Sequence, residues 1–61
     1  MKFKVTYRLK VLTGERYLLE EFDRTAIVEA EQPDDQLIEV ALSKEINKPL
    51  NEIKILLMDN A

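Results

Sequence analysis

Few side chains in this 61-residue sequence could do chemistry. The chain has no His and no Cys, which excludes thiol and imidazole nucleophiles, disulfides and every His- or Cys-ligated metal site. Its one serine, Ser43, has no histidine to activate it, so nucleophilic catalysis lacks a second member. Ser43 is therefore expected to be a solvent-facing residue of a helix.

Two groups of carboxylates remain. The first could do acid–base work, but we expect it to face Lys and Arg of the first strand across a sheet; it contains Glu20, Glu21 and Asp23. The second is the best candidate for a hard cation, but it lacks the glycine of a calcium loop and is better explained by electrostatics at a helix start; it contains Glu31, Asp34, Asp35 and Glu39. We predict no catalytic residue, no metal and no cofactor, and hence not an enzyme.

Composition predicts one folded domain over residues 1–61. Hydrophobic residues make up 46% of the chain and charged residues 34%, too apolar for a disordered tail. No run approaches the roughly 18 apolar residues of a membrane span, and residues 1–4 alternate where a signal peptide would be apolar. A cytoplasmic protein with no membrane partner is expected.

The first strand, about residues 2–12, has an alternating pattern that predicts an antiparallel strand with one face in water. The expected core face carries Phe3, Val5, Tyr7, Leu9 and Val11. The expected solvent face is basic and carries Lys2, Lys4, Thr6, Arg8 and Lys10.

A turn at 13–15, containing the only glycine, should lead into a return strand over about 16–30. Tyr17 and Leu19 differ in parity from Phe22 and Val28, so we expect a one-residue β-bulge to switch the buried face near 20–23. A two-residue Thr13-Gly14 turn is the alternative. It would pair Leu9 with Leu18 and move Tyr17 and Leu19 outward beside the lysines.

A helix over about 33–47 and a final strand over about 53–58 complete the predicted elements. Pro33 suits the first helical position, and the residue before Pro49 is pushed out of the α region. The order is β-β-α-β. We predict a small α+β domain with a three-stranded, mainly antiparallel sheet of strand order 2-1-3 and one helix on one face.

Residues 10–15, Lys-Val-Leu-Thr-Gly-Glu, together with 29–31 and 48–57, resemble the first hairpin turn, helix and third strand of ubiquitin-like β-grasp domains. The resemblance covers about two thirds of the chain, which ends where that family adds its last strands. Conjugation in the family needs a C-terminal Gly-Gly, whereas residues 58–61 read Met-Asp-Asn-Ala. The resemblance implies a protein-binding patch at Leu12 and Leu56, with ordinary core or rim positions as the alternative.

The final strand is apolar on both parities, with Ile53, Ile55 and Leu57 on one and Leu56 and Met58 on the other. One helix layer should leave one set uncovered. If the strand is an edge, a partner would supply the cover; a central position is the alternative. The sequence thus predicts a non-catalytic protein-interaction module, a homodimer or a small accessory or regulatory subunit, through Leu12, Leu56 and Met58.

Charge is divided unevenly along the chain. Residues 1–16 carry a net charge of +4 and residues 17–61 carry −7. The split favours a basic strand face paired with acidic neighbours. The alternative function is a nucleic-acid-binding module that uses Lys2, Lys4, Arg8 and Lys10, although the pI of 4.8 disfavours it.

Overall fold

A computed structural model describes all 61 residues as a small α+β domain. The elements follow the predicted order, with the return strand divided in two. They are β1 (Lys2–Thr13), β2 (Arg16–Leu19), β3 (Arg24–Glu29), α1 (Asp35–Ile46), the 3₁₀ turn Leu50–Glu52 and β4 (Ile53–Asn60).

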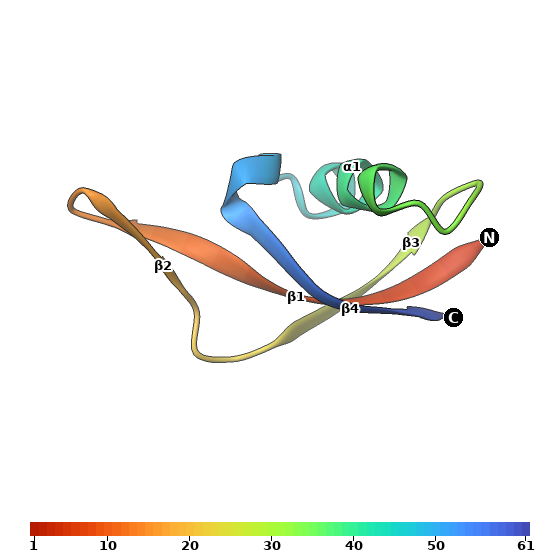
Figure 1. The fold of residues 1–61 in the computed structure, drawn as a ribbon, viewed down its shortest axis with the longest axis horizontal. Coiled ribbons are helices and arrows are strands. Elements are labelled where there is room, and N and C mark those ends of the chain that lie inside the picture. Colours follow the sequence, from red (N-terminus) through yellow and green to blue (C-terminus); the bar gives the residue numbers. More distant parts are fainter.

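Strand β1 is the centre of the sheet, and every other strand pairs with it in antiparallel orientation (Figure 1). Its first half lies between β3 and β4, from Lys2 opposite Glu29 to Leu9 opposite Ile53. Its last four residues pair with β2. The predicted fold is therefore confirmed: β2 and β3 together form the return strand on one side of β1, and β4 is an edge strand on the other.

The core lies between α1 and the first half of β1. Phe3, Val5 and Tyr7 are buried as the alternation predicts, and Ile38 and Leu42 of the helix are fully buried against them. Val11 was expected on the same buried face, but it is 50% exposed. A 12-residue helix spans about 18 Å, whereas the 12 residues of β1 extend over about 40 Å, so the helix covers only part of the strand.

The break in the return strand differs from both predicted registers. Thr13 pairs with Arg16, which leaves a two-residue loop in which Gly14 has φ +64°. Lys10 pairs with Leu19, but Tyr7 pairs with Arg24, so residues 20–23 add two residues rather than one. An insertion of two preserves the parity of the strand. The expected switch of face is therefore wrong, and no bulge of one residue occurs there.

Helix α1 starts two residues later than predicted. Asp34 is the N-cap, and its side chain accepts hydrogen bonds from the backbone N–H groups of Gln36 and Leu37. Pro33 therefore lies before the cap and not at the first helical position. Asn47 ends the helix with φ 56°, in the left-handed region that Asn tolerates better than most residues.

A β-bulge in β4 resolves the two-sided apolar pattern of the last strand. Thr6 pairs with Leu57 and Tyr7 pairs with Ile55, so Leu56 is an extra residue between them. The bulge shifts the parity, and Ile53, Ile55 and Met58 all pack toward the core. The expectation that Met58 shares an uncovered face with Leu56 is therefore wrong.

Truncation of the buried helix face should be costly. We expect Leu42→Ala to lower the free energy of unfolding by about 2–5 kcal/mol, because the side chain is fully buried. Leu37→Ala, on the same helix but 45% exposed, is the matched control and should cost far less. Urea denaturation followed by circular dichroism measures both, and equal losses would contradict this placement of the core.

Candidate functional site

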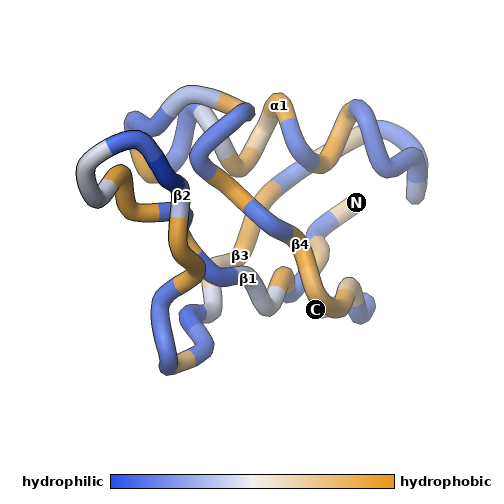
Figure 2. The backbone as a smooth tube through the Cα atoms, turned by 60° about the vertical axis from the view of Figure 1, so that its left-hand side comes forward, coloured by the Kyte–Doolittle hydropathy of each residue, from blue (hydrophilic) through white to orange (hydrophobic).

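The end of the β1–β2 hairpin projects from the body of the molecule as an arm, which we define as residues 10–19 (Figure 1). Every residue from Val11 to Leu19 is exposed. The molecule measures 38 × 19 × 16 Å, and the arm forms one end of the long axis. Figure 2 shows hydrophobic stretches along this arm, away from the helix.

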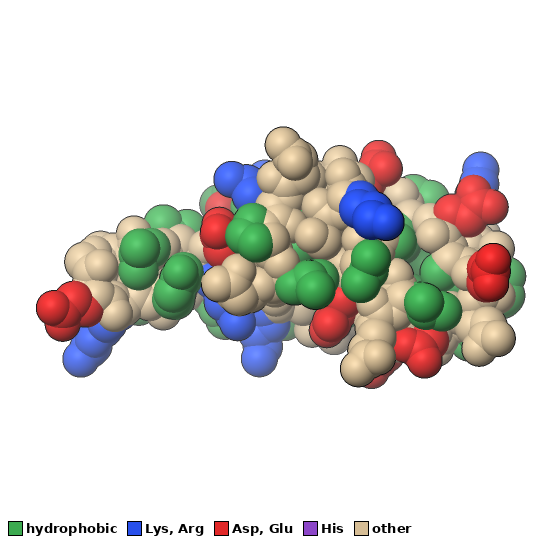
Figure 3. Space-filling view, turned by 90° about the horizontal axis from the view of Figure 1, so that it is seen from above, with side chains coloured by type: hydrophobic (Ala, Val, Ile, Leu, Met, Phe, Trp, Pro, Cys, Tyr) green, Lys and Arg blue, Asp and Glu red, His purple; other side chains and the backbone are tan.

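Both faces of the arm are apolar. Val11 pairs with Leu18, so these two side chains share the face that continues from the core. On the opposite face Leu12 pairs with Tyr17, and Leu19 lies beside Lys10. All five apolar side chains are between 42% and 58% exposed. Seen from the helix side, green apolar side chains on the arm have nothing above them (Figure 3).

The arm also has two free backbone edges. Strand β2 pairs only with β1, and the pairing of β4 with β1 ends at Leu9 opposite Ile53. Two-stranded hairpins are marginally stable in water unless a further strand or a helix covers them. The arm therefore combines free backbone edges with exposed apolar side chains.

A cluster of side chains connects the arm to the body where the return strand breaks. We call it the elbow, and it consists of Arg8, Glu20, Phe22, Asp23 and Arg24. Glu20 is its centre: its backbone N–H donates to the carbonyl of Leu9 over 3.0 Å, and its carboxylate accepts from the backbone N–H of Leu9 over 3.2 Å. The carboxylate thus replaces the carbonyl that a regular ladder would supply there. Arg24 holds it in place through two hydrogen bonds of 2.8 Å.

Arg8 and Phe22 complete the elbow. Arg8 forms an ion pair of 2.6 Å with Asp23 and donates to the carbonyl oxygen of Glu20. The guanidinium of Arg24 lies 5.0 Å from the centre of the Phe22 ring, within range of a cation–π interaction. Of the carboxylates expected to face strand 1, Asp23 pairs with Arg8 as predicted, whereas Glu20 pairs with Arg24.

The hydrogen bonds from Arg24 hold the pKa of the Glu20 carboxyl below its ordinary value, against a smaller opposing effect of desolvation. The same contact raises the pKa of Arg24. Both groups are therefore stabilised in their charged forms. Glu20 and Arg24 thus form a structural ion pair within the elbow.

The basic face of β1 is interrupted by acids. Lys2 lies opposite Glu29 and Lys4 opposite Asp59 in the strand registers. Arg8 is engaged by Asp23, and Lys10 stands apart on the arm. The four predicted basic residues therefore share a face of one strand, but they do not form a continuous positive track of the kind that follows a phosphate backbone.

The three predicted interaction residues do not lie together. Leu12 is exposed on the arm, and Leu56 is exposed at the bulge of β4, whereas Met58 is partly buried against the core. Sequence reasoning missed Leu18 as an exposed arm residue, and considered Tyr17 and Leu19 exposed only in the alternative register. The length of the first strand could have indicated these exposed residues, because a strand of 12 residues is longer than a helix of 12 residues can cover.

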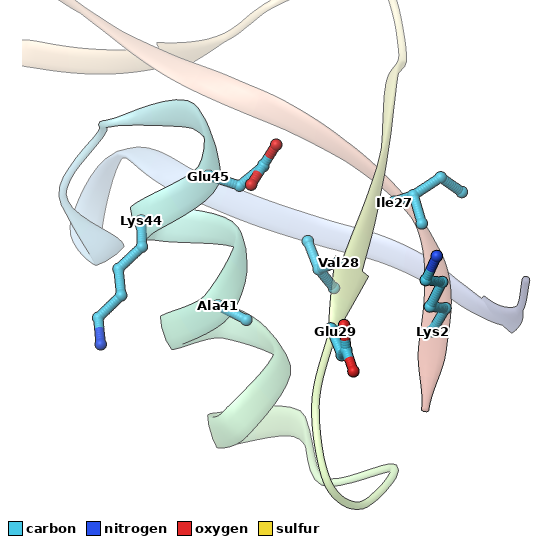
Figure 4. Close-up of a pocket in the computed structure, with 7 residues that line it drawn as sticks. All are labelled: Lys2, Ile27, Val28, Glu29, Ala41, Lys44 and Glu45. Atoms are coloured by element: carbon cyan, nitrogen blue, oxygen red, sulfur yellow. The ribbon is translucent and has the colours of Figure 1, made fainter.

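Three grooves flank the helix. The largest, of about 510 Å³, lies between α1 and β3, and one of about 330 Å³ lies between α1 and residues 29–31. Figure 4 shows Val28 of the largest groove pointing toward the helix, whereas Lys44 extends away from the groove. The charged side chains of this groove do not converge on a common point. The second groove, of about 340 Å³, lies between α1 and β4. Ser43 lines none of the three grooves, and its hydroxyl donates to the carbonyl oxygen of Lys48 at the helix end.

No three carboxylates gather at a point where they could hold a metal ion. The helix is too short and too polar to cross a membrane.

Comparisons with protein-family models, curated proteins and solved structures returned no match. The β-grasp resemblance therefore rests on the quoted residues alone.

The elbow predicts a pH dependence of stability. Because the pKa of Glu20 is lowered on folding, its contribution is present above the ordinary value of 4.5 and is lost as the pH falls through the lowered value. We expect the urea midpoint to drop with acidification in that range. Glu20→Gln should make this drop shallower, while Glu21→Gln, at an exposed neighbour without a hydrogen-bond partner, serves as control. Identical pH profiles for wild type and Glu20→Gln would contradict the role of the elbow.

Proposed function

We propose that this chain is a non-catalytic protein-association module whose main contact surface is the arm. The observation that carries this proposal is that the arm is apolar on both faces and has no cover within the chain. Thirteen large apolar side chains are exposed, against seven buried residues, and five of the thirteen are on the arm. Exposed apolar surface of this kind is typical of protein-binding sites.

Two further features support association over catalysis. The side chains with strongly engaged charges, Glu20 and Arg24, satisfy each other and hold the arm in position. The grooves beside α1 lack a nucleophile with an activating base. The chain thus offers an exposed apolar surface rather than a set of converging reactive groups.

The proposed interaction surface differs from the one that the sequence predicted. The last strand was the expected centre, but the bulge in β4 turns Met58 toward the core and leaves Leu56 and Leu57 as its exposed apolar residues. Tyr17 and Leu18 of the arm take the place of Met58 in the proposal. Aromatic side chains such as Tyr are enriched at the energetic centres of protein interfaces.

Photo-crosslinking in cells tests this proposal. A photoreactive residue in place of Leu12 should form a defined protein adduct, and Tyr17→Asp in the same chain should reduce its yield, because the two residues face each other on the arm. The control places the photoreactive residue at Gln32, which is exposed in the loop between β3 and α1, at the opposite end of the molecule from the arm (Figure 1). The same adducts at both positions, or none at Leu12, would overturn the proposal.

The alternative function, nucleic-acid binding, is tested by measuring affinity and its dependence on salt concentration. Because acids interrupt the basic face, we expect no measurable affinity for duplex DNA or single-stranded RNA in low-salt buffer by fluorescence anisotropy. An affinity that falls steeply with salt concentration would contradict this expectation. In that event Lys4→Glu should abolish binding, while Lys44→Glu should not.

A further inference from the structure

The groove between α1 and β4 is the second surface that lacks cover. It is lined by Asp35 and Glu39 from the helix and by residues 55–58 of β4, all four of which are apolar. Neither carboxylate takes part in an ion pair. Leu56 and Leu57 are exposed, and the bulge places Leu56 outside the regular ladder. The groove is thus apolar along the strand and acidic along the helix.

The arm has the complementary composition. It carries five exposed apolar residues together with Lys10 and Arg16, and with Glu15 as its only acid its net charge is +1. Neither Lys10 nor Arg16 has an ion-pair partner within the chain. A basic apolar projection and an acidic apolar groove therefore occur in the same molecule.

We propose that the arm of one copy docks in the α1–β4 groove of a second copy, and that the second arm returns the contact. This rests on the proposed function and names the partner as a second copy of this chain. The charge distribution supports it, because the arm carries a net charge of +1 and the other residues together carry −4. Reciprocal exchange closes the assembly at two copies, whereas a one-way contact would propagate into a filament.

The geometry and the area are compatible with this exchange. The arm occupies one end of the long axis, and β4 runs beside the helix in the middle of the molecule (Figure 1). Two copies lying antiparallel can therefore place each arm beside the other body. A stable dimer buries about 800 Å² per partner, about a sixth of the 4606 Å² surface of this chain. One arm and one groove per copy contribute to that area.

Charge reversal on each side separates this arrangement from other dimers. The arm variant is Lys10→Glu with Arg16→Glu, and the groove variant is Asp35→Lys with Glu39→Lys. Each variant alone places like charges at both contacts, so we expect its dimerisation to weaken by about tenfold or more. In an equimolar mixture, the reversed arm meets the reversed groove and the native arm meets the native groove. The mixture should therefore recover a dimer.

Sedimentation velocity at matched concentrations provides the readout, with circular dichroism to show that each variant is folded. Lys44→Glu with Glu45→Lys, on the exposed side of α1 away from the groove, should leave the wild-type dimer unchanged. The proposal is overturned by a wild type that stays monomeric at millimolar concentration, by a groove variant that dimerises like the wild type, or by a mixture of folded variants that stays monomeric. A monomeric wild type that still crosslinks to a foreign protein through Leu12 would overturn the second-copy partner and leave the proposed function intact.

Discussion

The mismatch in length between β1 and the helix is the constraint on which the rest of the structure depends. Twelve residues of strand extend over about 40 Å, whereas twelve residues of helix cover about 18 Å. The first half of β1 therefore has a helix above it and strands on both sides, while the last four residues have only β2. The core forms over the covered part of β1, and the arm contains the uncovered part.

Two departures from regular pairing fit the other strands to β1. The two extra residues at 20–23 let the return strand leave β2 and resume as β3 without a change of face, and the Glu20 carboxylate supplies the acceptor that is lost there. The bulge at Leu56 turns Met58 toward the helix. The bulge adds Met58 to the packing of the body, and neither irregularity contributes cover for the arm.

The sequence was sufficient for the architecture because the signals for it are local. Strict alternation in β1, the helical spacing of Ile38 and Leu42 and the right-handed crossover predict strand order and core face. The position of the arm was not predicted, because Val11 continues the alternation of the core residues although no helix lies above it. The register at Gly14 depends on the geometry of the turn, and the pairing of Glu20 with Arg24 depends on how many residues the break inserts. Parity alone reveals neither.

Amide hydrogen exchange at low and high protein concentration tests the central claim, that the arm is ordered by a partner and the body by its own core. Since Glu20 donates to Leu9, the alternation of the ladder makes Val11 and Leu18 a hydrogen-bonded pair. We expect their amides to exchange rapidly in dilute solution and to become protected at high concentration, while the amides of Val5 and Val28 stay protected throughout. Equal protection of arm and body in dilute solution would contradict the account.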